Sequence, residues 1–69
     1  MIRIYRVPNK NYPIGEGRNL REAVKDAYKN DELTAYDELY REDENEQIEA
    51  LEDYVTSARA DFIIVGSEE

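Results

Sequence analysis

The sequence predicts a small α+β domain, in which a two- or three-stranded sheet with paired N- and C-terminal strands is covered on one face by two to three helices. Three observations predict this class. Both ends of the chain are rich in β-branched and apolar residues, as strands are, whereas apolar residues in the middle recur at helical spacing. The 69 residues suit one domain over positions 1–69. With 41% hydrophobic residues, the chain is also more apolar than a disordered protein.

The first strand is expected over residues 1–7, where apolar and polar side chains alternate. Pro8 cannot donate a ladder hydrogen bond, so the strand should end there. A short return strand that includes Tyr12 and Ile14 would complete a hairpin. Residues 15–18, Gly-Glu-Gly-Arg, are expected to be a flexible connector into the first helix.

The first helix is predicted over residues 20–29. Asn19 is a favourable N-cap, and Glu22 follows it three residues later, as in a capping box. The apolar residues then recur at i, i+3, i+4, i+7 and i+8, which gives one continuous stripe. The stripe consists of Leu20, Ala23, Val24, Ala27 and Tyr28.

Two further helices are expected in the middle of the chain. A short one should cover residues 33–41, capped by Asp31 or Thr34, and a longer one should run from 44 to 58 or 59, capped by Asp43. The apolar side of the short helix would consist of Leu33, Tyr36, Leu39 and Tyr40. The buried stripe of the longer helix would consist of Ile48, Leu51, Val55 and Ala58.

The last strand is expected over residues 61–65. Four consecutive apolar residues bounded by Asp61 and Gly66 favour a strand that is buried on both faces. It should pair beside the first strand, in parallel orientation if the helices form a right-handed crossover.

Charge is distributed very unevenly along the chain. Residues 31–53 hold eleven acidic side chains and one arginine, a net charge of −10, whereas the first thirty residues hold seven bases and three acids, a net of +4. The chain as a whole carries −8. Such a chain would be repelled by nucleic acid and by anionic membranes, so neither is an expected partner. The expected partner is a basic surface of a protein or ribonucleoprotein complex.

The residues needed for several kinds of chemistry are missing. The sequence contains no Cys and no His, so it offers no thiol or histidine-activated nucleophile. The stretch that starts at Asp43 resembles an EF-hand loop, but Ile48 and Tyr54 stand at its sixth and twelfth positions. Gly15-x-Gly17 lacks the third glycine of the dinucleotide-binding pattern. We therefore expect a protein that is not an enzyme and has no metal or cofactor. No run is long and apolar enough to cross a membrane, and a cytoplasmic location is expected.

The acidic side chains are the candidate binding residues. Glu42, Glu46, Glu49 and Asp53 would stack along one face of the longer helix, provided that the helix reaches back to Glu42. Carboxylates three or four residues apart on a helix lie about 5–6 Å apart. That spacing is comparable to the one between successive phosphates of a nucleic-acid strand. The remaining members of the predicted protein-binding site are Asp37, Glu38, Tyr40, Glu44 and Glu52.

In charge and size the chain resembles phage-encoded nucleic-acid mimics that block restriction enzymes or CRISPR effectors. The resemblance implies a small inhibitor that occupies the basic groove of a nucleic-acid-processing complex. An interaction or assembly module, either a homodimer or a regulatory subunit with a tyrosine-rich apolar surface, is the alternative. A salt-adapted structural domain is the third possibility.

Overall fold

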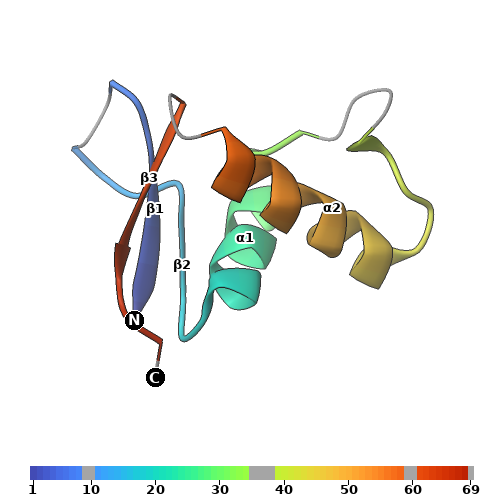
Figure 1. Cartoon of the computed structure of the whole chain (residues 1–69), viewed down its shortest axis with the longest axis horizontal. Coiled ribbons are helices and arrows are strands. Elements are labelled where there is room, and N and C mark those ends of the chain that lie inside the picture. Colours follow the sequence, from blue (N-terminus) through green and yellow to red (C-terminus); the bar gives the residue numbers. More distant parts are fainter. Residues whose placement is uncertain (9–10, 35–38, 59–60, 69) are drawn as a thin grey trace.

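The computed structural model describes residues 1–8, 11–34, 39–58 and 61–68. Its elements follow one another as β1 (Ile2–Arg6), β2 (Gly15–Gly17), α1 (Leu20–Lys29), α2 (Glu44–Ser57) and β3 (Phe62–Gly66). The strands form a three-stranded antiparallel sheet in the order β2-β1-β3. Both helices lie on one side of this sheet, with α1 next to β2 and α2 beyond α1 (Figure 1). The α+β class with paired terminal strands is confirmed.

β3 pairs beside β1 as expected, but the two strands are antiparallel, so the parallel orientation expected for a right-handed crossover is not found. The reason is the path of the chain through the helices. α2 ends near the C-terminal end of β1. β3 therefore starts at that end and runs back along β1 (Figure 1). The backbone N–H of Val7, just after β1, donates to the carbonyl of Asp61, just before β3, at 2.9 Å.

The expectation that the last strand is buried on both faces was also wrong. Phe62 is buried, but Ile64 is 39% exposed and Val65 is 48% exposed. β3 lies at the edge of the sheet, and the helices cover only one face. The apolar residues of this strand are therefore only partly buried within one chain.

Residues 15–17 form strand β2, so the flexible connector predicted there was wrong. The return strand begins just after Tyr12 and Ile14, although the Ile14 N–H already donates to the Ile4 carbonyl at 2.7 Å. Glycine allows α1 to lie directly on this strand. A Cβ atom at Gly15 would lie against the carbonyl oxygen of Ala23 and 2.8 Å from the Cβ of Ala27.

Both long helices begin where their capping residues predict. The Asn19 side chain accepts from the Glu22 N–H at 2.9 Å, and the Asp43 side chain accepts from the Glu46 N–H at 3.1 Å. α1 has the predicted bounds, and α2 ends at Ser57. A short helix was predicted over residues 33–41. Of these, residues 33, 34 and 39–41 are not α-helical, and residues 35–38 lie outside the described part.

The core lies between the sheet and the two helices. The predicted stripe of α2 is buried at Ile48, Leu51 and Val55, and Ala58 packs partly against the core. From the sheet come Ile2, Ile4 and Phe62, and from α1 come Ala23, Val24 and Ala27. Because Ala23 and Ala27 are small, the backbone of α1 comes close to β2, and α2 fills the space on the other side of α1.

The C-terminus of α1 ends in a Schellman motif. The Glu32 N–H donates to the Ala27 carbonyl at 3.0 Å, and the Asp31 N–H donates to the Tyr28 carbonyl at 3.2 Å. Asp31 occupies the left-handed position of the motif, with φ at 59°. Glycine is the preferred residue there, because a Cβ atom is strained in that conformation.

Replacing Gly15 by Ala should destabilise the fold. The added methyl group has no space between β2 and α1, so we expect a loss of about 1–3 kcal/mol in the free energy of unfolding, measured by urea titration. Glu16→Ala is the matched control, because the Glu16 side chain is exposed on the same strand and forms a surface ion pair with Arg3, while its backbone N–H bond to Asp26 is kept in the variant. Equal stability of the two variants would contradict the close packing of α1 on β2.

Replacing Asp31 by Gly should stabilise the protein. The change relieves a left-handed residue and removes a negative charge from the C-terminal end of a helix, with an expected gain of roughly 0.5–1 kcal/mol. Thermal unfolding followed by circular dichroism measures the gain. Asp31→Ala removes the same charge without relieving the backbone, so it should be less stable than Asp31→Gly. The reverse order would rule out the backbone argument.

Candidate functional site: the outer face of α2

Three carboxylates share the solvent side of α2. Because Ile48, Leu51 and Val55 turn the opposite side of the helix into the core, Glu46, Glu49 and Asp53 are exposed. These three residues, called the outer face below, line one shallow hollow of about 290 Å³. The hollow is completed by Arg41 and Ala50.

The outer face keeps its charge turned to solvent. In the described ranges two ion pairs are present, Arg3–Glu16 at 3.3 Å and Arg18–Glu22 at 3.6 Å, and neither involves a carboxylate of α2. Like charges at this spacing destabilise a helix by about 0.2–0.5 kcal/mol per pair. The fold tolerates that repulsion because the other side of α2 is anchored in the core.

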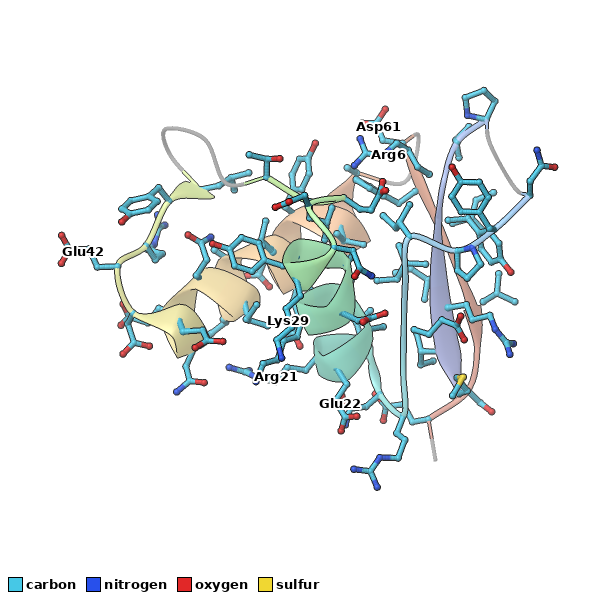
Figure 2. The ribbon with its side chains drawn as sticks, turned by 180° about the vertical axis from the view of Figure 1, so that it is seen from behind. Arg6, Arg21, Glu22, Lys29, Glu42 and Asp61 are labelled. Atoms are coloured by element: carbon cyan, nitrogen blue, oxygen red, sulfur yellow. The ribbon has the colours of Figure 1, made fainter. Side chains whose placement is uncertain are left out.

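Glu52 faces a different environment on the same helix. It is half-buried, and burial raises its pKa above the ordinary value of 4.5. The charge of Arg21 lowers the pKa, while Asp53 and Glu49 raise it further. Arg21 extends from α1 and donates to the Asn45 carbonyl at 3.1 Å, which places the guanidinium beside α2 (Figure 2). Glu52 therefore belongs to the side of α2 that faces α1.

The other predicted site residues do not join the outer face. Glu42 was expected on the carboxylate ridge, but α2 begins at Glu44, so Glu42 precedes the helix and points away at the far end of the molecule (Figure 2). Glu44 lines a separate hollow with Lys29 and Tyr40. Asp37 and Glu38, both predicted site residues, lie outside the described residues. The structure thus brings together three of the four predicted ridge carboxylates.

The segment before α2 is held by Gln47, which the sequence analysis overlooked. This side chain is buried at 2% exposure, accepts from the Arg41 N–H at 2.8 Å and donates to the Leu39 carbonyl at 2.8 Å. It fixes Tyr40, which is 58% exposed, at the N-terminal end of α2. Its spacing was the available signal, because Gln47 stands four residues before Leu51 and so shares the inner side of the helix.

The arrangement offers hydrogen-bond acceptors and negative charge on an open surface. Such a surface binds Lys and Arg side chains by charge-assisted hydrogen bonds. Within the described ranges, no group of three or more acidic residues is placed to hold a metal ion. Over the same ranges, the helices are too short or too polar to cross a membrane. No protein-family model, curated protein or solved structure matches the chain.

Neutralising Glu52 should stabilise the protein at neutral pH. Its pKa is raised in the folded state, so its favourable contribution is fully present below 4.5 and is lost as the pH rises through the folded-state pKa. Glu52→Gln removes this loss, so its free energy of unfolding should exceed that of the wild type near neutral pH. Urea titrations at several pH values should show the difference shrinking towards about pH 4.

Glu42→Gln is the control for this prediction, since it removes the same charge from a residue outside α2. A gain of the same size in both variants would mean that net charge alone, rather than the position of Glu52, sets the effect.

Proposed function

We propose that this chain is a small acidic protein-binding inhibitor. Its outer face would occupy a basic surface on a nucleic-acid-processing complex, such as a restriction enzyme or a CRISPR effector, and so exclude the phosphate backbone that this surface normally holds. The protein itself would not bind nucleic acid, because its net charge of −8 repels phosphates.

One observation carries the proposal: Glu46, Glu49 and Asp53 are exposed on a single helix face and line the same hollow. Positions three and four residues apart place neighbouring side chains about 5–6 Å apart. Lys and Arg side chains that contact successive phosphates could therefore contact successive carboxylates. Since α2 is anchored through its buried side, its carboxylates are presented without a large ordering cost on binding.

Three arginines of the basic half are engaged away from the outer face. Arg3 and Arg18 pair with Glu16 and Glu22 of the same half of the sequence. Arg6 donates to the Glu32 carbonyl and lies over the Phe62 ring, 5.4 Å from its centroid, so it supports the fold. The excess negative charge is thus available to steer a basic partner, with association that weakens as salt increases.

An assembly role through the exposed tyrosines has less support. Tyr12 is 60% exposed in the connection between β1 and β2, whereas Tyr40 lies just before α2. These two segments lie at opposite ends of the molecule, so they do not form one surface (Figure 1).

The proposal is tested by inhibition of DNA cleavage. A panel of restriction endonucleases and RNA-guided nucleases is assayed on duplex DNA, with and without this protein. We expect at least one enzyme to be inhibited, with inhibition that decreases as salt is raised from low to physiological concentration. The triple variant Glu46→Gln, Glu49→Gln, Asp53→Asn should lose at least tenfold in inhibitory potency.

The matched control neutralises three exposed carboxylates elsewhere: Asp31→Asn, Asp61→Asn and Glu68→Gln. Both triple variants change the net charge from −8 to −5, so only the position of the lost charge differs. Equal losses in the two variants would show that bulk charge acts, and unchanged potency of the outer-face variant would refute the proposal.

A further inference from the structure

The free edge of β3 has none of the charge, proline or bulge that commonly protects an edge strand. Phe62 to Val65 contains no charged residue and no proline, and its pairing with β1 runs in register without a bulge. Ile64 and Val65 are exposed on opposite faces of the strand, at 39% and 48%. In the part of the chain that the structure describes, no strand lies beyond β3.

The hydrogen bonds at the two ends of β3 show which backbone groups point away from β1. The Val7 N–H donates to the Asp61 carbonyl, and the Met1 nitrogen donates to the Ser67 carbonyl, both at 2.9 Å. In an antiparallel ladder, residues alternate between hydrogen-bonded and non-hydrogen-bonded pairs. Residues 61, 63, 65 and 67 therefore direct their backbone groups to β1, and Ile64 directs its N–H and carbonyl to the free edge.

We propose that β3 pairs antiparallel with β3 of a second copy of this chain, about a twofold axis at Ile64. The N–H of each Ile64 then donates to the carbonyl of the other, which makes the central hydrogen-bonded pair of a six-stranded sheet. Phe62 of one copy lies opposite Gly66 of the other. The Gly66 N–H can donate to the Phe62 carbonyl, while the Phe62 N–H keeps its bond of 3.2 Å to the Ala58 carbonyl.

The same register matches apolar side chains on both faces. On the open face of the sheet, Ile63 of each copy lies opposite Val65 of the other, in a non-hydrogen-bonded pair where side chains come closest. Tyr5 extends this apolar strip, since it is the β1 partner of Ile63. On the helix side, Ile64 meets its copy beside a hollow of about 380 Å³ lined by Val55, Thr56 and Phe62.

The self-complementary register selects a second copy as the occupant, and the charges of the chain do not oppose it at the centre of β3. No charged side chain lies between residues 62 and 66, whereas the acid-rich N-terminal half of α2 lies at the end of the molecule remote from the sheet (Figure 1). Two chains of net charge −8 can therefore meet with acidic side chains only at the ends of the pairing, where Asp61 of each copy lies opposite Ser67 of the other and next to Glu68. Their long-range repulsion is screened by salt, so this association strengthens with salt, opposite to binding through the outer face of α2.

Sedimentation equilibrium at several protein and salt concentrations tests the pairing. We expect a monomer–dimer equilibrium whose dissociation constant falls as salt rises. Val65→Lys should raise that constant at least tenfold, because it adds an edge-protecting charge at an already exposed position. Tyr12→Lys adds the same charge at an exposed site away from β3 and should leave the constant within twofold. A monomer at millimolar concentration, or equal effects of both variants, would overturn the proposal.

Amide hydrogen exchange by NMR gives a second measurement that does not depend on a variant. The Ile63 and Val65 amides bond to β1 in a single chain and should be protected at every protein concentration. The Ile64 amide should exchange fast in dilute protein and become protected as the dimer forms. Fast exchange of Ile64 in a sample that sediments as a dimer would place the interface elsewhere.

The outer face is intact in Val65→Lys, so this variant should still inhibit a nuclease and lose only the part of its potency that depends on two linked outer faces. Complete loss of inhibition in Glu46→Gln, Glu49→Gln, Asp53→Asn together with unchanged dimerisation would separate the outer face from the β3 interface.

Discussion

The close contact between β2 and α1 is the constraint on which the rest of the structure depends. Gly15 and Gly17 have no side chains, and α1 presents the small residues Ala23 and Ala27 to them, so helix and strand backbones approach closely. This contact fixes the position of α1 over the sheet. α2 then packs on α1 and fills the remaining core with Leu51 and its neighbours. The orientation of the outer face on α2 therefore depends on the contact between α1 and β2.

The parts of the fold that the sequence predicts are those with local causes. The starts of α1 and α2 follow from Asn19 and Asp43, whose side chains cap backbone groups three residues away. The direction of β3 has no such cause, because it depends on where α2 ends relative to the sheet. The role of Gly15 was missed for a similar reason. Glycine before a helix usually indicates flexibility. Only the packing of α1 on β2 shows that a side chain at position 15 would have no room.

The candidate site was predictable in part, and the position of Glu42 outside the helix was foreseeable from the sequence. If Asp43 is the N-cap, Glu42 cannot lie on the face of the same helix, because a residue before the cap lies outside the helix. The cap prevailed, because it satisfies a backbone N–H group that the first helical turn leaves unpaired. Glu52 shows the other limit. The charge that lowers the pKa of this carboxyl comes from Arg21, 31 residues away in the sequence, and periodicity along one helix cannot indicate such a neighbour.

The two proposed surfaces lie on different layers of the molecule and reinforce each other. In the twofold pairing, residues of β3 that face the helices lie opposite residues that also face the helices, so both α2 helices stand on the same side of the six-stranded sheet. A dimer would then present two outer faces together. A long basic groove could engage both, and the second contact would form at the effective concentration set by the rigid sheet rather than at that of the free protein. Weak, salt-sensitive contacts through three carboxylates per chain would in this way give tight binding to an extended basic surface.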